Sequence, residues 1–289
     1  MISKEMLSSK LLDLGIKKGD LIFLTVNIGS IGYFNKNRKQ TYQDLFDVFV
    51  DILDIDSGGL ILPAYTNGGP LWKATNQSFS LNTKTHAGEF SNFFLNHEKS
   101  FRSYHPYYSC VGVGKRAIKA LEKINIHSKA YQIFDSFQED RAFYLMIGTA
   151  YDKKNASPSL HYCQEKLGYT KYFLFKHIEN ITLSNTKEKI KRKDSGGCSK
   201  GGYKLNIELI SQKIAKDFVF GKAKSILIDP VKSTKYTYSK LLKNRKTYIC
   251  DNQLCLRCNG NYYYEPLNFI KIMFLRIHEN IKNRFKFFI

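Results

Sequence analysis

Short apolar runs alternate with helical patterns along the first half of the chain, which predicts strands interleaved with helices. The runs Leu21–Val26, Leu60–Thr66 and Ala142–Thr149 are nearly continuous in apolar residues, as expected for strands buried on both faces. Between the first two, apolar residues recur at helical spacing from Leu45 to Leu53, after a suitable N-cap at Thr41. A strand, a helix and a strand joined by short links predict a βαβ unit and an α/β fold.

The second half combines further helices with two unusual segments. Ser159–Gly168 has a helical pattern, whereas Ser184–Lys204 is polar, basic and rich in glycine. We interpret Ser184–Lys204 as a loop that is either mobile or in contact with phosphate. Residues 246–289 hold three cysteines and a basic amphipathic helix, so we separate them as an extension from a domain that spans residues 1–245. We expect this helix to pack on its own domain, and the alternative is peripheral contact of residues 269–289 with an anionic membrane surface, at the inner face of the membrane.

Charge narrows the classes of partner. The chain of 289 residues carries 45 Lys and Arg against 25 Asp and Glu, a formal net charge of +20. Such a field favours anionic ligands, namely nucleotide cofactors, nucleic acid or anionic lipid, and disfavours polycations. The sequence has no recognisable nucleic-acid-binding signature, so we expect no nucleic-acid partner. No apolar run approaches the about 18 residues of a transmembrane helix, and the N-terminus lacks a signal-peptide pattern, which predicts a cytoplasmic protein.

Six cysteines raise the question of a metal site. Cys255 and Cys258 form one C-x-x-C pair, and Cys250 lies nearby. A structural zinc site needs four ligands, usually from two such pairs, and Cys198 in the basic segment is the distant fourth candidate. We expect scattered reduced thiols and no metal, with a zinc knuckle as the alternative.

Four segments, taken in order, carry a resemblance to a known family. They read "LLDLGIKKGDLIFLTVNIGSIG" from Leu11, "GGLILPAYT" from Gly58, "GEFSNFFLNHEKSFRSYHPYYSCVGVG" from Gly88 and "LMIGTAYDKKNASPSLHYCQE" from Leu145. With these motifs, which fall within residues 5–170, the chain resembles the aminoglycoside 3-N-acetyltransferase family, whose members use acetyl-CoA and are distinct from the GNAT superfamily. The resemblance implies a mixed central sheet flanked by helices and acetyl transfer from acetyl-CoA, with no metal.

Histidine is the natural base for this reaction, because an amine must lose a proton to attack a thioester near neutral pH. The resemblance places that base at His161. The family carries an acid three residues after the histidine, where this chain has Gln164, and the acid here comes one residue later at Glu165. Because residues four apart share a helix face, we expect Glu165 to orient His161. Gln164 is then a substrate contact or an orienting amide.

The resemblance also yields candidate binding residues, although the family's His-Ser-Ser after the first strand is replaced here by Thr25, Val26 and Asn27. The candidates for coenzyme A and the developing oxyanion are Asn27, Ile28, Gly29, Thr66, Thr85, Arg102, Ser103, His105 and Ser109. The candidates for the acceptor are Tyr65, Asn67 and Glu89.

The net charge bears on the acceptor. Because a chain of +20 disfavours polycations, we expect an anionic or neutral amine, first of all a nucleotide-linked amino sugar used in surface polysaccharide synthesis. The alternatives are an aminoglycoside acceptor, as in antibiotic resistance, and a catalytically silent family member that acts as a binding protein. The sequence does not distinguish a monomer from a homodimer.

Overall fold

The computed structural model describes residues 3–32, 37–67, 69–70, 78–170, 179–192, 197–261 and 266–285, and the structural statements below concern these residues. The N-terminal elements are α1 (Lys4–Asp13), β1 (Leu21–Val26), α2 (Ile28–Ile31), α3 (Arg38–Leu53), β2 (Gly59–Pro63), β3 (Gly69–Pro70), β4 (Ser78–Phe79), α4 (Glu89–Leu95), β5 (Phe101–Arg102), β6 (Cys110–Val113), α5 (Lys115–Glu122), the 3-10 helix η1 (Gln132–Phe137) and β7 (Ala142–Ile147). The later elements are α6 (Pro158–Lys166), β8 (Glu179–Leu183), β9 (Lys189–Lys191), the 3-10 turn η3 (Ser199–Gly201), α7 (Gly202–Ser211), β10 (Ala215–Phe220), β11 (Ala223–Ile228), α8 (Pro230–Lys243), the π-helical turn η4 (Leu256–Asn261) and α9 (Pro266–Phe285).

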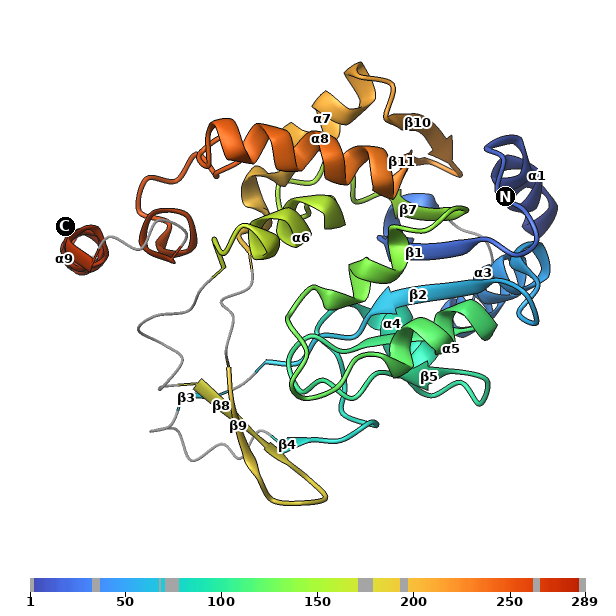
Figure 1. Ribbon diagram of the computed structural model, residues 1–289, viewed down its shortest axis with the longest axis horizontal. Coiled ribbons are helices and arrows are strands. Elements are labelled where there is room, and N and C mark those ends of the chain that lie inside the picture. Colours follow the sequence, from blue (N-terminus) through green and yellow to red (C-terminus); the bar gives the residue numbers. More distant parts are fainter. Residues whose placement is uncertain are drawn as a thin grey trace.

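A mixed sheet forms the centre of the molecule (Figure 1). Within the described residues its strand order is β10-β11-β7-β1-β2-β6-β5. Strand β1 is parallel to both β2 and β7, whereas the other neighbours pair antiparallel. The predicted βαβ unit is therefore confirmed as β1, α3 and β2, and the predicted α/β fold with a mixed, helix-flanked sheet is confirmed as well.

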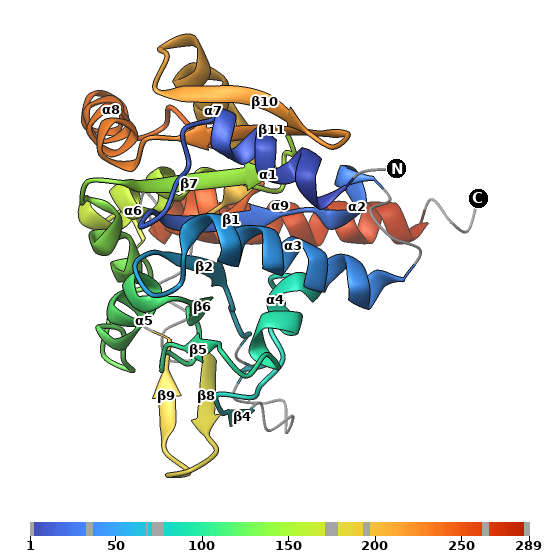
Figure 2. The same ribbon diagram turned by 90° about the vertical axis from the view of Figure 1, so that its right-hand side faces the viewer.

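Strand β1 separates two cores because successive side chains of a strand point to opposite faces. Leu21 and Phe23 join one apolar cluster, together with side chains of α5, α6, α7 and α8. Ile22 and Leu24 join the other, together with side chains of α1, α3 and α4. Figure 2 looks onto the side that α1 and α3 cover. Burial on both faces explains why β1 reads as a continuous apolar run.

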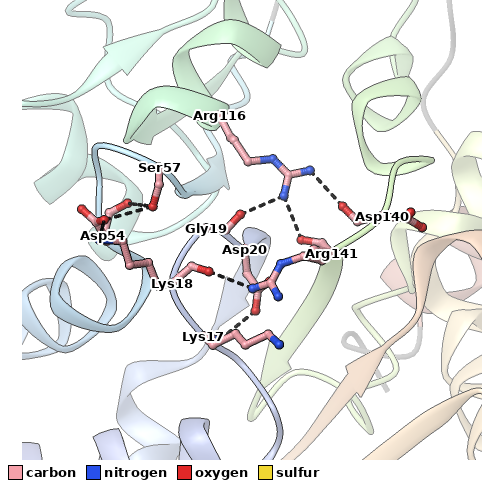
Figure 3. A network of polar contacts seen from close by, with 9 residues as sticks. All are labelled: Lys17, Lys18, Gly19, Asp20, Asp54, Ser57, Arg116, Asp140 and Arg141. Atoms are coloured by element: carbon pink, nitrogen blue, oxygen red, sulfur yellow. Dashed lines mark hydrogen bonds and ion pairs between the residues drawn. The ribbon is translucent and has the colours of Figure 1, made fainter.

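A polar network fixes the N-terminal ends of β1 and β7 (Figure 3). Arg116 Nη1 donates to the carbonyl oxygens of Gly19 and Arg141, at 2.9 and 3.1 Å. Arg141 Nη2 donates to the carbonyl of Lys18 and pairs with the carboxylate of buried Asp20 at 2.5 Å. The Gly-Asp element of the first family motif therefore serves the fold, at the end of β1 opposite to the carboxyl end.

Two boundaries differ from the sequence predictions. Helix α3 begins at Arg38 rather than near Thr41, because the Asn37 side chain caps it by accepting from the Lys39 N–H at 2.9 Å. The basic segment Ser184–Lys204 is not one loop. Strand β9 pairs with β8 in a small second sheet, and η3 leads into α7, while residues 193–196 lie outside the described part of the chain.

The C-terminal extension also corrects two expectations. The amphipathic helix exists as α9, with residues 286–289 outside the described range, but it packs on the protein only along a narrow stripe that includes buried Ile272. Leu267 and Phe274 are 83% and 67% exposed, so the expected packing on the domain is wrong for most of the helix. No described helix is long and apolar enough to cross a membrane.

The four cysteines outside the two main cores are not scattered. Cys198, Cys250 and Cys258 are buried, Cys255 is half-buried, and their sulfurs lie together. The expectation of scattered thiols is therefore wrong.

Candidate active site

A cavity of about 560 Å³ opens at the carboxyl ends of β1, β2 and β7. Its lining includes Thr25 and Asn27 at the end of β1, Pro63 and Tyr65 at the end of β2, and Thr149 just after β7. In the sheet, β2 lies on one side of β1 and β7 lies on the other. The strand order therefore reverses at β1. Ligands of open α/β sheets bind at this place, because the loops that leave neighbouring strands diverge there.

Helix α6 brings His161 to the cavity. The helix begins at Pro158, a residue suited to the first turn because its missing N–H would have no intrahelical partner. Every residue from Pro158 to Glu165 is buried, and the Ser159 hydroxyl contacts that of Ser233 on α8 at 2.7 Å. Burial on all sides fixes the helix and therefore the position of the imidazole.

Both ring nitrogens of His161 have partners. Nδ1 lies 2.9 Å from Oε1 of Gln164, and Nε2 lies 3.0 Å from Oγ of Ser199. Because an amide oxygen only accepts, Nδ1 carries the proton and Nε2 is the basic nitrogen, which accepts from the Ser199 hydroxyl. The ring of Tyr131 stacks on the imidazole with centroids 5.3 Å apart. His161, Tyr131 and Ser199 all line the cavity.

The surroundings favour the neutral imidazole. Burial lowers the pKa of His161 to about 4, although the hydrogen bond that Nδ1–H donates to Gln164 Oε1 raises it. A buried cation without a carboxylate partner is costly, which explains the sign of the shift. At neutral pH the ring is therefore in the form that accepts a proton.

Glu165 does not make the predicted contact with His161. Its Oε2 accepts a hydrogen bond from the backbone N–H of Tyr131 at 3.0 Å. The carboxylate thus holds the residue that stacks on His161, and its effect on the imidazole is indirect. Gln164, the first of the two candidates along the chain, provides the direct contact.

Three polar residues of the cavity were missed from the sequence. Ser199 lies in the basic segment Ser184–Lys204, but it is 38 residues from His161, so local sequence gives no signal that its hydroxyl meets the imidazole. Thr25 and Thr149 contact each other through their hydroxyls at 3.0 Å, and both line the cavity. Their position at the ends of two predicted strands was the available signal.

A sequence model of the family described as aminoglycoside 3-N-acetyltransferase matches residues 24–241, which include the cavity-lining strand ends and α6. The chain belongs to the aminoglycoside 3-N-acetyltransferase family. It is therefore an acetyltransferase, with acetyl-CoA as cosubstrate and an amine as acceptor. A search of curated proteins found no match.

Solved structures share the fold at low sequence identity. The apoenzyme of aminoglycoside acetyltransferase AAC(3)-IVa is 15% identical with a TM-score of 0.73, over 91% of this chain and 97% of its own. The YokD protein from Bacillus subtilis is 17% identical with a TM-score of 0.71, over 85% of this chain and 95% of its own. AAC-IIIb in binary complex with CoASH is 16% identical with a TM-score of 0.64, over 84% of this chain and 97% of its own.

Several of the predicted binding residues of this family member do line the cavity. They are Asn27, Ile28, Gly29, Tyr65 and Glu89. Asn67 is exposed and lies outside the lining. The loop after β1 thus faces the cavity even though this acetyltransferase lacks the His-Ser-Ser sequence of its family there.

Arg102 is held by hydrogen bonds within the fold, and its assignment to coenzyme A stays a prediction. Its Nε donates to Ser109 Oγ at 3.1 Å, Nη1 donates to the carbonyl of Leu81 at 2.9 Å, and Nη2 donates to the carbonyl of Ala64 at 2.9 Å. Ser109 in turn donates to Ala64 at 2.7 Å. Burial lowers the pKa of Arg102 to about 10, which leaves the guanidinium charged at neutral pH. Both residues lie outside the cavity lining.

The other polar residues of the "RSYHP" segment and its neighbours are likewise used by the fold. Nδ1 of His105 accepts from the backbone N–H groups of Tyr107 and Tyr108, at 3.1 and 2.9 Å. Ser103 accepts from the backbone N–H of Cys110 at 2.9 Å. The Thr66 and Thr85 hydroxyls donate to the carbonyls of Pro106 and Tyr65, at 2.6 and 2.9 Å. All four residues are buried outside the lining, and their assignment as coenzyme contacts stays a prediction.

Proposed function

We propose that His161 is the general base that takes a proton from the acceptor amine during acetyl transfer. The observation that carries this proposal is the buried neutral imidazole whose Nε2 faces Ser199 at the cavity wall, while Gln164 holds Nδ1. Gln164 fixes the tautomer, and the stacked ring of Tyr131 fixes the plane of the imidazole. The amine approaches Nε2 in place of the Ser199 hydroxyl.

In the proposed step, the amine nitrogen bonds to the carbonyl carbon of the acetyl group and the carbon–sulfur bond breaks. Attack turns the amine into an acidic ammonium, so even a base of low pKa accepts its proton. The proton passes from Nε2 to the departing thiolate, which yields coenzyme A and restores the neutral ring. The hydroxyls of Thr25 and Thr149, which contact each other and line the same cavity, are the candidates for holding the acyl group.

For the acceptor, we propose an amine on an amino sugar of the aminoglycoside type. The family description supports this choice, as does the existence of a structurally similar enzyme, AAC-VIa, that binds sisomicin. Glu89 on the cavity lining supplies a carboxylate for a second ammonium group of such a substrate. An ion pair at that place favours a cationic amino sugar over a neutral amine.

A second candidate is an anionic, nucleotide-linked amino sugar. Two observations favour it: the net charge of +20, and the presence of Arg38 on the same cavity lining. Of the lining residues that the structure describes, Glu89 is the one carboxylate, so the cavity offers a polycation a single ion-pair partner.

The test is release of coenzyme A thiol from acetyl-CoA across aminoglycosides, free amino sugars and nucleotide-linked amino sugars. The class with the highest kcat/KM identifies the acceptor. His161→Ala is expected to lose about 10²- to 10⁴-fold in kcat, the usual contribution of a general base. His127→Ala removes an exposed histidine outside the cavity lining and serves as the control. If wild type releases no thiol with any amine, the chain is a silent member that binds ligands, and the proposal is wrong.

We further propose that α9 contacts an anionic membrane surface peripherally. Exposed Ile270, Phe274 and Ile277 form an apolar stripe, and exposed Lys271 and Arg276 flank it. Apolar burial combined with basic residues is the pattern of helices that lie in the membrane interface.

A further inference from the structure

Four sulfur atoms from distant parts of the chain form one group. The sulfurs of Cys198, Cys250, Cys255 and Cys258 all lie within 4.8 Å of one another. The Sγ–Sγ distance is 3.7 Å between Cys255 and Cys198 and 3.6 Å between Cys258 and Cys250. A disulfide requires about 2.05 Å. Four thiolates around Zn²⁺ at about 2.3 Å lie about 3.8 Å apart, which fits the observed distances.

The surroundings of the four sulfurs do not explain their convergence by packing alone. Cys198, Cys250 and Cys258 form a separate small cluster, bordered by partly buried Tyr169 and Ile249. Burial of so few apolar atoms contributes little free energy compared with either main core. A segment of loop and π-helical turn with so small a core needs another source of stability, and a bound metal is a common one.

We propose that Cys198, Cys250, Cys255 and Cys258 bind one Zn²⁺ as a closed structural site. Four sulfur ligands that can surround one ion tetrahedrally favour zinc among the common divalent ions. They also fill its coordination shell, so no position stays open for catalysis. On binding, the thiols release their protons to solvent, so the centre carries a formal charge of −2. Lys200 and Arg257 lie within two residues of ligands and are exposed, which suits an anionic centre in a basic chain.

The site would position the segment that carries Ser199. Ser199 directly follows Cys198, and its hydroxyl contacts Nε2 of His161 at 3.0 Å. A Cβ on Gly201 would lie 2.3 Å from the carbonyl oxygen of Tyr248. The backbone of η3 therefore packs against the backbone of the segment that leads into Cys250. The metal therefore holds together the two segments on which the Ser199 position depends, and it acts as a positioning element.

The first experiment measures metal content in the full-length chain, purified under reducing conditions without chelator or added metal. We expect about one zinc per chain. Cys250→Ser and Cys258→Ser are expected to lose it, because three thiolates and a hydroxyl bind zinc much more weakly. Cys110→Ser is the matched control, since Cys110 is a free buried cysteine in β6 outside the group, and it is expected to keep full occupancy.

The second experiment uses the wild-type chain, so it stands even if the variants fail to fold. Zinc is removed with a chelator and replaced by Co²⁺, which is expected to give the visible bands and the sulfur-to-cobalt charge-transfer absorption of a tetrahedral tetrathiolate site. The melting temperature is expected to fall on chelation and to recover with Zn²⁺ but not with Mg²⁺. No activity measurement is involved, so the outcome is independent of the proposed acetyl transfer.

Three results would overturn the proposal. The first is wild-type chain without zinc that also gives no cobalt spectrum. The second is mass-spectrometric detection of disulfides linking Cys198 with Cys255 and Cys250 with Cys258 in the native protein. The third is full zinc occupancy in Cys258→Ser, which would place the ion elsewhere.

Discussion

Replacing Gln164 by glutamate tests how the base is tuned. In the wild type, burial holds the pKa of His161 at about 4, below its ordinary value of 6.5. A carboxylate at the position of the amide, 2.9 Å from Nδ1, would stabilise the imidazolium and raise the pKa by about 1 to 3 units. We therefore expect Gln164→Glu to move the pKa of His161 to between about 5 and 7.

The same change alters stability against pH with a definite sign. The folded-state pKa of His161 lies below the unfolded-state value. As pH falls from 6.5 to about 4, the unfolded chain therefore takes up a proton at this residue that the folded chain does not. This linkage lowers the free energy of unfolding by about 3 kcal/mol over that window, at about 1.4 kcal/mol per unit. Above pH 6.5 the imidazole is neutral in both states, so none of this free energy of unfolding is lost. Gln164→Glu is expected to make this loss of unfolding free energy smaller, because it brings the folded-state pKa closer to the unfolded-state value.

The assay is a titration of the histidine ring signals by NMR, with His161→Ala used to assign the resonance. Urea unfolding at several pH values measures the linked stability. Gln212→Glu adds the same charge at an exposed position after α7 and is expected to leave both quantities unchanged. The reasoning would be refuted if wild-type His161 titrates near 6.5, or if its titration does not move upward in Gln164→Glu.

Three further predictions concern other parts of the chain. Glu165→Gln keeps an acceptor for the Tyr131 N–H and is expected to cost less than about 1 kcal/mol, whereas Glu165→Ala leaves that buried group without its partner and is expected to cost about 1–3 kcal/mol in urea unfolding; equal losses would contradict the assigned role. Arg102→Ala is expected to destabilise the fold by about 3–5 kcal/mol, because it removes a buried charge with its hydrogen bonds. The KM of the folded enzyme for acetyl-CoA is expected to stay within about twofold. A large rise in this KM would instead make Arg102 a coenzyme contact. Phe274→Asp is expected to abolish co-sedimentation with vesicles containing anionic lipid, and wild-type binding is expected to weaken with salt; a wild-type chain that stays in solution at low salt would remove the membrane proposal.

Sequence reasoning found the strands because they depend on local pattern, and the family resemblance named His161 as the predicted base. Strands β1, β2 and β7 are buried on both faces, so each appears as an apolar run with turn residues around it. His161 follows the third run at the start of a helix whose first turn carries Pro158. The structure places this histidine in the cavity at the carboxyl ends of the strands, where ligands bind.

The neighbours of His161 depend on contacts that local pattern does not determine. Gln164 and Glu165 are three and four residues after His161, and both positions share its helix face. The Glu165 carboxylate accepts from the backbone N–H of Tyr131, and the Gln164 amide contacts the imidazole instead. That N–H lies 34 residues upstream, so helix geometry alone could not decide between the two residues.

The "RSYHP" segment shows why composition alone does not assign a role to polar residues. Polar side chains near glycines are the composition of a ligand loop, but they are also what a buried turn needs to satisfy its own backbone groups. Arg102 bonds the carbonyls of Ala64 and Leu81, and His105 bonds two N–H groups of its own loop. Composition cannot separate these uses, because the difference lies in where the polar atoms point.

The backbone contact between Gly201 and the Tyr248–Ile249 segment has a consequence for synthesis of the chain. Strands β1 and β7 and helix α6 lie within the first 166 residues, so they leave the ribosome early and are free to assemble. Residues 248–249 emerge more than 80 residues later, and only then does the turn that holds Ser199 gain the surface against which it packs. The position of Ser199 beside Nε2 of His161 therefore depends on a segment that is synthesised after the strands and after helix α6.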